Sequence, residues 1–312
     1  MDARRAGVAI VLVSAAVVAF ESVAVEGALN IANIDLFLVS AVPPIMGGVI
    51  LLGIRPRETR GFVNSLGLSG WAKMLVLGAL VGVGVLLWFD AVRRIGASKE
   101  AILGGGSSEV LFVVLLSALF LRERLKQLEA VGSVLVLGGV FIVLTNTSEV
   151  TLTIGPGEIE AVASSLVLGS SVVYTTHLLR DYDLTPLSGL ELLLSGVVVL
   201  AVGTAAGIIR LPGDSWGWII LVLIGLFPAI GLGTYNSGLP RVGASLTSVL
   251  FALNGIMTVG VQLAVLAFAP NANIMLPQSV PLAVLGGVVA FAGVYLLNRR
   301  PTNNRKGAEG EI

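Results

Sequence analysis

Glu109 is a carboxylic acid in the middle of a long apolar stretch, residues 98–120. An ionisable group at the centre of a membrane helix costs at least about 2.5–3.5 kcal/mol, so it invites a functional hypothesis. The run Gly104-Gly105-Gly106-Ser107-Ser108 comes directly before it. Three consecutive glycines favour a bend or a partly unwound segment with gating or structural importance. Because burial favours a neutral carboxyl group, we expect Glu109 to carry a proton or to bind a solute. A structural Glu bonded to nearby backbone is the alternative.

A second acid, Glu21, lies in the apolar stretch 7–27. Helical spacing places it on the same face as Ser14, seven residues earlier. Glu21 is either another acid of an internal cavity or, like Glu26, an entrance residue close to water. The sequence leaves both interpretations open.

A stripe of polar residues follows one face of the stretch 244–268. Its members are separated by steps of seven, four and four residues, and they are Thr247, Asn254, Thr258 and Gln262. Such a stripe faces either a cavity or another helix, where a hydrogen bond contributes about 0.6 kcal/mol on average. We predict a cavity, with Asn254, Thr258 and Gln262 as substrate-contacting residues.

Aromatic residues and the single His complete the set of candidate residues. Tyr174 and His177 follow Ser170 at helical spacing in the stretch 157–178. His177 near a helix end is typical of an interfacial residue, and a proton carrier is the alternative. Trp88 and Tyr235 line a solute path or belong to an aromatic belt at the membrane surface.

Several kinds of chemistry are excluded by composition. The absence of Cys rules out disulfides and thiolate chemistry, and a single His leaves no usual metal-ligand cluster. No phosphate-binding loop or hydrolase motif is present. We therefore expect no catalytic site, no enzyme activity, no metal and no cofactor. With 55% apolar and only 12% charged residues, a soluble enzyme, a nucleic-acid binder and a disordered chain are excluded as well.

The composition indicates an all-α integral membrane protein with ten transmembrane helices. A membrane helix needs roughly 20 mainly apolar residues. The expected spans are 7–27, 34–54, 72–94, 98–120, 126–145, 157–178, 187–209, 215–237, 244–268 and 280–298. We expect a central site formed mainly by the first, third, fourth, sixth, eighth and ninth of these spans.

The positions of Lys and Arg predict the orientation. With the N-terminus in the cytoplasm, 15 of the 19 Lys and Arg residues fall on the inner side. The other four are Arg93, Arg94, Lys99 and Arg210. Both termini are therefore expected in the cytoplasm of a cell (plasma or inner) membrane. Glu123, between Arg122 and Arg124, is expected to form a structural or gating ion-pair cluster.

The two halves of the sequence are related by an internal repeat. A shift of 147 residues superposes Trp88 on Tyr235, Gly84 on Gly231 and the run 94–98 on 241–245. Each repeat contains five spans, so the second copy enters the membrane from the opposite side. Such inverted repeats are typical of secondary transporters. The repeats are assigned to residues 1–148 and 149–312.

The end of the first repeat also carries a recognisable pattern, GASKEAILGGGSSEVLFVVLLSALFLRERLKQLEAVGSVLVLGGVFIVL. In it the chain resembles the drug/metabolite transporter superfamily, specifically its ten-helix EamA-type members. Glu109 and Glu123 match two glutamates of that pattern. Val110 replaces its usual Pro and Arg122 its usual Gly, and Ile256 stands at the position equivalent to Glu109. The resemblance implies two inverted five-helix repeats and transport of small metabolites, mostly outward.

The function expected from these observations is secondary active transport of a small metabolite by alternating access. Efflux of an amino acid or similar compound, with proton coupling, is the favoured form. A nucleotide-sugar or lipid carrier of the same fold is the first alternative, and a membrane enzyme or sensor is the second. The expected partners are a small-molecule substrate and the lipid bilayer, without nucleic acid, and a homodimer is left open.

Overall fold

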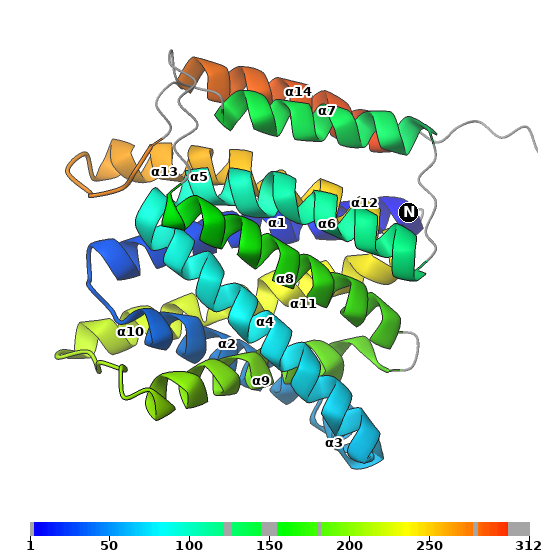
Figure 1. The fold of residues 1–312 in the computed structure, drawn as a ribbon, viewed down its shortest axis with the longest axis vertical. Coiled ribbons are helices and arrows are strands. Elements are labelled where there is room, and N and C mark those ends of the chain that lie inside the picture. The colour runs from blue at the N-terminus through cyan, green and yellow to red at the C-terminus, as the bar shows by residue number, and fades with distance from the viewer. Residues whose placement is uncertain (1–2, 122–126, 145–154, 180–181, 277–279, 299–312) are drawn as a thin grey trace, which may run out of the picture.

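The computed structural model describes residues 3–121, 127–144, 155–179, 182–276 and 280–298, and in this part of the chain there are helices but no strands (Figure 1). The helices are α1 (Ala3–Asn30), α2 (Leu36–Ile54), α3 (Pro56–Ser65), α4 (Leu68–Ile95), α5 (Ala97–Ala101), η1 (Ile102–Ser108), α6 (Glu109–Leu116), η2 (Ser117–Leu121), α7 (Gln127–Leu144), α8 (Pro156–Leu178), α9 (Leu184–Ala205), α10 (Ser215–Ile224), α11 (Leu226–Val242), α12 (Ala244–Phe251), α13 (Asn254–Phe268) and α14 (Val280–Asn298).

Each of the ten expected spans coincides with one helix or with an interrupted run of helices in the described residues. Seven of these segments are at least 18 residues long and apolar enough to cross a bilayer. The other three passes are the interrupted fourth span, α7 and α14. The prediction of an all-α membrane protein is confirmed.

One helix was not expected. Residues 55–67 were assigned to a connection, but they contain α3, a short helix of ten residues that begins with Pro56. Proline is favoured at the first helical position because its fixed φ matches the helix and its missing N–H has no partner there. Phe62 anchors α3 by an edge-to-face contact with Tyr182, with ring centroids 5.5 Å apart.

Polar residues in the connections fix where the spans begin. The Asp35 carboxylate accepts hydrogen bonds from the backbone N–H groups of Phe37 and Leu38, at 2.9 and 3.3 Å. Asp214 caps α10 in the same way through Gly217 N–H. These caps satisfy backbone donors that have no partner inside the helix, at the edge of the apolar segment.

The two repeats pack on each other through reciprocal helix pairs. α1 of the first repeat packs on α11 of the second, and α8 of the second packs on α4 of the first. Ser14 in α1 donates a hydrogen bond to Gly231 O at 2.7 Å, and Ser164 in α8 donates one to Gly84 O at 3.0 Å. The two acceptors, Gly231 and Gly84, are superposed by the repeat, so Ser14 and Ser164 make equivalent contacts and the interaction is made twice.

The direction of the helices shows that the repeat is inverted. In Figure 1, α1 starts at the right edge, whereas α8, the first helix of the second repeat, starts at the left edge. The turns that end α4 and α11 are equivalent: Gly96 has φ 83° and ψ 155°, and Gly243 has φ 86° and ψ 157°. α7 and α14, the fifth helix of each repeat, pack together at one end of the molecule (Figure 1).

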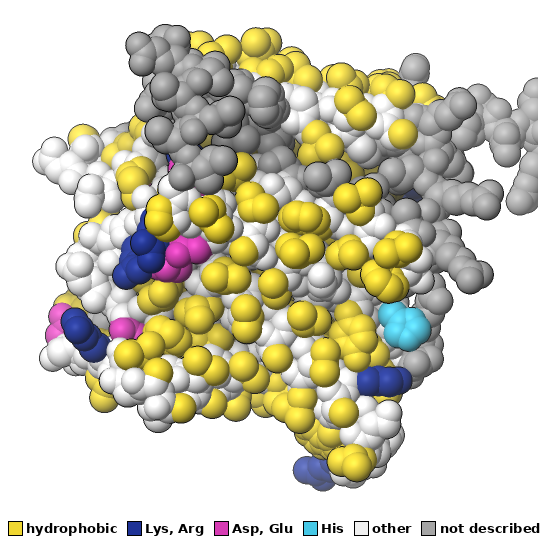
Figure 2. All heavy atoms as spheres, in the orientation of Figure 1, with side chains coloured by type: hydrophobic (Ala, Val, Ile, Leu, Met, Phe, Trp, Pro, Cys, Tyr) yellow, Lys and Arg dark blue, Asp and Glu magenta, His cyan; other side chains and the backbone are white. Residues whose placement is uncertain are grey.

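The surface agrees with a lipid environment. On the face drawn in Figure 2, hydrophobic side chains cover the middle, and the charged side chains lie toward the edges. Phe20 and Val49 are among the large apolar residues that are more than half exposed. Two of the cations expected on the outer side are paired across the repeats, Arg94 with Glu160 at 3.0 Å and Lys99 with Glu158 at 2.5 Å.

Gly96→Ala is predicted to destabilise the protein by roughly 1–3 kcal/mol, because the backbone conformation of this turn is essentially restricted to glycine. The added Cβ would also lie only 2.8 Å from the Met275 Cβ. The measurement is the thermal unfolding midpoint of the purified protein in detergent.

The matched control for this substitution is Gly53→Ala, a helical position where the new Cβ meets no atom within 4 Å. Its midpoint should be unchanged or slightly higher, since Ala has the better helix propensity. Equal midpoints for Gly96→Ala and the unmodified chain would contradict the requirement for glycine at this turn.

Candidate functional site

A cavity of about 140 Å³ lies between the two repeats. Both repeats line it, and among the described side chains α7 and α14 contribute none. All six spans that were expected to form the central site contribute lining residues. Two further helices, α2 and α9, contribute Pro44 and Glu191. The volume is below the roughly 300–1,000 Å³ of pockets for drug-sized ligands. The cavity therefore suits a compact solute.

Four glutamates from four different helices line this cavity. They are Glu21 of α1, Glu100 of α5, Glu109 of α6 and Glu191 of α9. None of them is more than 6% exposed. No Lys, Arg or His is found among the described lining residues. An isolated carboxylate is costly in a low-dielectric interior, so these acids need hydrogen bonds, a proton or a cation brought by a solute.

The π-helical segment η1 brings Glu100 and Glu109 together. The Glu109 N–H donates to Gly104 O, five residues earlier, where an α-helix would use the residue four before. A Cβ at Gly104 would collide with the Glu100 carboxyl group, so a larger residue here would displace that side chain. The glycine run was expected to bend or unwind the helix. It forms a π-helix instead, and such segments are frequent at functional sites.

Asn254 faces η1 from the second repeat. An added Cβ at Gly105 would lie 3.3 Å from Asn254 Nδ2 and 3.9 Å from Glu109 Oε2, so both side chains border the same glycine. Asn254 is 3% exposed, and its Oδ1 has no hydrogen-bond partner in the described part of the structure. Asn254 begins α13 just after the break that follows α12. The interrupted fourth and ninth spans thus meet at the cavity.

The repeat-related aromatic residues Trp88 and Tyr235 both line the cavity. Trp88 interacts with the Glu100 carboxyl group through its side chain. The Tyr235 hydroxyl is 2.9 Å from Ser248 Oγ, and its ring packs edge-to-face on Phe251 with centroids 5.0 Å apart. Both residues therefore border the cavity between the repeats.

Glu191 is bound by a hydrogen-bond network within the second repeat. Asn236 Nδ2 donates to Glu191 Oε2 at 3.0 Å, and Thr175 Oγ1 donates to Oε1 at 3.4 Å. Asn236 also contacts Ser188 Oγ at 2.9 Å. Glu191 therefore has polar partners on both carboxyl oxygens.

Four residues predicted to contact substrate do not line this cavity: Tyr174, His177, Thr258 and Gln262. His177 is exposed, in line with an interfacial position. Thr258 donates to Asn254 O within its own helix, at 2.8 Å. Glu123, predicted to form a gating cluster, lies outside the described residues.

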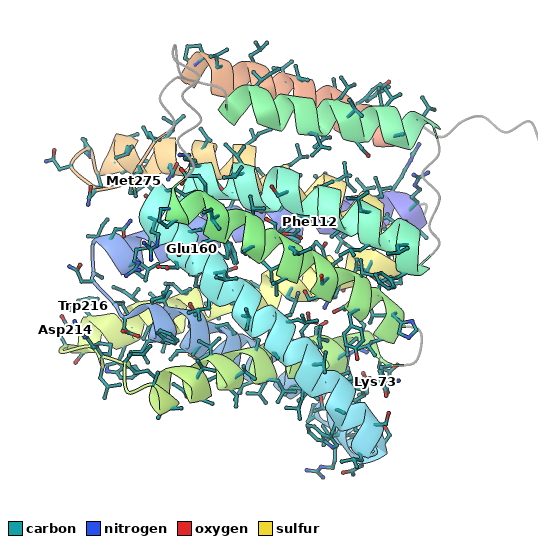
Figure 3. All side chains as sticks on the ribbon, viewed as in Figure 1. Lys73, Phe112, Glu160, Asp214, Trp216 and Met275 are labelled. Atoms are coloured by element: carbon teal, nitrogen blue, oxygen red, sulfur yellow. The ribbon has the colours of Figure 1, made fainter. Side chains whose placement is uncertain are left out.

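Glu26 was interpreted as a residue close to water, and this is wrong, since the side chain is fully buried. Its Oε2 accepts from Gln262 Nε2 at 2.7 Å and from Ala97 N at 3.3 Å, and its Oε1 accepts from Met275 N at 3.0 Å. These donors come from both repeats. Glu26 therefore joins α1, α5 and α13 at the edge of the molecule where Met275 lies (Figure 3).

Glu100 and Glu191 were not singled out from the sequence. Glu100 stands beside Ser98 and Lys99 at the start of the expected span 98–120, and it was not considered as a buried acid. Glu191 lies inside the expected span 187–209, where the criterion applied to Glu109 would have found it. Of the expected candidates, the structure brings together Glu21, Trp88, Glu109, Tyr235 and Asn254.

Glu26→Ala is predicted to open the edge at Met275. The substitution removes the acceptor of three hydrogen bonds, two of them buried, and a hydrogen bond to a charged group contributes about 1.5–3 kcal/mol. The chain has no Cys, so a single Val85→Cys in the cavity reports its accessibility. Its labelling by a membrane-impermeant maleimide should accelerate roughly tenfold or more when Glu26→Ala is added.

The matched control is Glu58→Ala, which removes an exposed acid of α3 paired with Arg55. It should leave the labelling rate unchanged. If Glu26→Ala and Glu58→Ala give the same rate, Glu26 does not hold this edge closed.

Comparisons with known proteins identify what the chain is similar to. The model of the EamA-like transporter family matches twice, over residues 5–145 and 155–299. An "Uncharacterized transporter" of Methanothermobacter thermautotrophicus (strain Delta H) is 24% identical over 299 residues, which cover 85% of this chain and 81% of that protein. A solved crystal structure has the same fold, with a TM-score of 0.69 at 17% identity, covering 93% of this chain and 96% of the other.

Proposed function

The chain belongs to the EamA-like transporter family of the drug/metabolite transporter superfamily, and from this premise we propose that it is a secondary active transporter working by alternating access. Its substrate is a small metabolite with an amino group, an amino acid or a similar compound, and transport is coupled to protons. The observation that carries the proposal is the cavity between the inverted repeats, lined by Glu21, Glu100, Glu109 and Glu191.

Alternating access is supported by the reciprocal contacts of the two repeats. The pairs α1–α11 and α4–α8 both line the cavity and make equivalent hydrogen bonds through Ser14 and Ser164. Inverted-repeat transporters work largely by rigid-body rocking of one half against the other around a fixed site. An exchange of the conformations of the two repeats would open the cavity to the opposite side.

Proton coupling is supported by the number of acids that share one small space. Neighbouring carboxyl groups in a low-dielectric site cannot all be ionised at once, because like charges disfavour each other. The titratable groups that face Glu109 across the cavity are Glu21, Glu100, Glu191 and Tyr235. In the proposed cycle, protons occupy this cluster when substrate does not.

The topology proposal places both termini in the cytoplasm of the cell (plasma or inner) membrane. α1 begins and α14 ends at the same edge of the molecule (Figure 1), as an even number of crossings requires. The arginines of α3 lie near that edge together with Lys73 (Figures 1 and 3), which agrees with the positive-inside rule. Outward transport rests on the family resemblance. The repeat boundary at residue 148 lies outside the described residues.

The alternatives find less support in the cavity. A nucleotide sugar carries phosphates, and the described lining residues contain no Lys, Arg or His to bind them.

Glu109→Gln is predicted to abolish substrate-driven proton movement. The amide keeps the size of the side chain but cannot take up and release a proton. The measurement is fluorescence of a pH indicator enclosed in proteoliposomes, after addition of single compounds from a panel of amino acids, nucleosides and amines.

The control variant is Glu58→Gln, which alters an exposed acid on α3 and should leave proton movement unchanged. Size-exclusion chromatography of each variant checks that folding is intact. If the Glu109→Gln variant transports with the rate and pH profile of the unmodified protein, Glu109 does not carry the coupled proton.

A further inference from the structure

Three hydrogen-bond acceptors from the two repeats meet at η1. Glu100 Oε2 and Asn254 Oδ1 are buried and have no hydrogen-bond partner among the described residues. Glu109 lies close enough to Glu100 to act on it electrostatically, and it shares the surroundings of Gly105 with Asn254. We call Glu100, Glu109 and Asn254 the acceptor cluster. Buried polar groups normally have partners, so these free acceptors point to a ligand that supplies donors.

The chemistry of the acceptor cluster defines that ligand. A carboxylate offers only acceptor sites, whereas an ammonium group offers three N–H donors and no acceptor. The ligand must also bring positive charge, because no cationic side chain is found among the described lining residues. Trp88, which contacts Glu100, adds an aromatic ring, and such rings attract cations by about 0.5–2 kcal/mol.

We propose that the substrate is a compact organic ammonium ion without a carboxylate, whose N–H groups donate to Glu100, Glu109 and Asn254. This inference rests on the proposed transport function and narrows its substrate class. The apolar part of the ion packs against Val81, Val85 and Phe251, which line the same cavity. The volume of about 140 Å³ limits this part to a few carbon atoms.

A zwitterionic amino acid fits this cavity less well than the corresponding amine. Its carboxylate would have to leave water for a space whose remaining ionisable groups are Glu21, Glu191 and Tyr235. Glu191 already accepts from Asn236 and Thr175, so these donors are engaged. The carboxylate of the amino acid would therefore lose its hydration and lie beside other carboxyl groups, with no cationic side chain to pair with it.

The exchange of charge follows from the same groups. When the ammonium ion enters, one carboxyl group of the acceptor cluster releases its proton and becomes the counter-ion. When the ammonium ion leaves, a proton returns to that carboxylate. The ammonium ion and the proton thus replace each other at the same carboxyl group. The low-dielectric cavity never holds two carboxylates without a cation.

The test compares three compounds of related shape: isobutylammonium, isobutanol and valine. Isobutanol replaces the ammonium group by a neutral hydroxyl, and valine adds a carboxylate to the same amine. Binding to the purified full-length protein is measured by isothermal titration calorimetry at neutral pH, where the amine is protonated. Isobutylammonium should bind about ten- to a hundredfold more tightly than either other compound, the range expected for a charge-assisted hydrogen bond.

Variants then assign binding to the acceptor cluster. Glu100→Gln and Asn254→Leu should each weaken isobutylammonium about tenfold or more, and Gly105→Ala should do the same by placing a methyl group against Asn254. Glu58→Gln is the exposed control and should bind like the unmodified protein. Gly53→Ala, in open space on α2, controls for the glycine substitution.

Two outcomes overturn this inference. One is valine or isobutanol binding as tightly as isobutylammonium, and the other is no binding of isobutylammonium. If an amino acid or nucleoside nevertheless drives proton movement in proteoliposomes, the proposed transport function stands and only the substrate class is wrong. If isobutylammonium binds as expected but moves no protons, the proton coupling fails and the binding site stands.

Discussion

The hydrocarbon core of a bilayer offers no water to a polar group, so backbone and side-chain polar groups at membrane depth must find partners inside the protein. Irregular backbone is tolerated at this depth only where protein buries it or where it lines a cavity. In this fold the π-helical η1 and the break between α12 and α13 both lie beside the cavity, at Gly105 and Asn254. The place of the site thus follows from the same requirement that makes the rest of the chain helical.

Much of the fold could be predicted from the sequence because its signals are local or periodic. Apolar length predicts the spans, and a constant shift that superposes Gly84 on Gly231 predicts the repeat. The α3 helix was not predicted, because it is short, with ten residues, and is not apolar. The π-helix was not predicted either, since three glycines weaken an α-helix without specifying which backbone conformation takes its place. What replaces it also involves contacts from the second repeat, such as Asn254 beside Gly105.

The site was predictable only in part, because the pairing of helices decides what a polar side chain meets. Asn254 and Gln262 share one helical stripe in the sequence, yet Asn254 lines the cavity and Gln262 donates to Glu26. Eight residues separate them, so they lie at different depths along the helix. Glu21 and Glu26 differ in the same way. One lines the cavity, and the other is satisfied by donors from both repeats.

The backbone of the two repeats is symmetric, but their chemistry is not. The equivalent contacts of Ser14 and Ser164 align α1 with α8 at an offset of 150 residues, which places Thr176 at the position of Glu26. The Thr176 hydroxyl donates to Val172 O within its own helix. The hydrogen bonds of Glu26 thus have no counterpart at the corresponding position of the second repeat. Likewise, Thr247 stands where the first repeat has Glu100. In the proposed alternating-access cycle, inverted symmetry supplies two conformations of similar geometry, and these differences would give them different energies. A bound cation or proton would then change the balance between them, because the proposed carboxylate partners in α5 and α6 belong to one repeat alone.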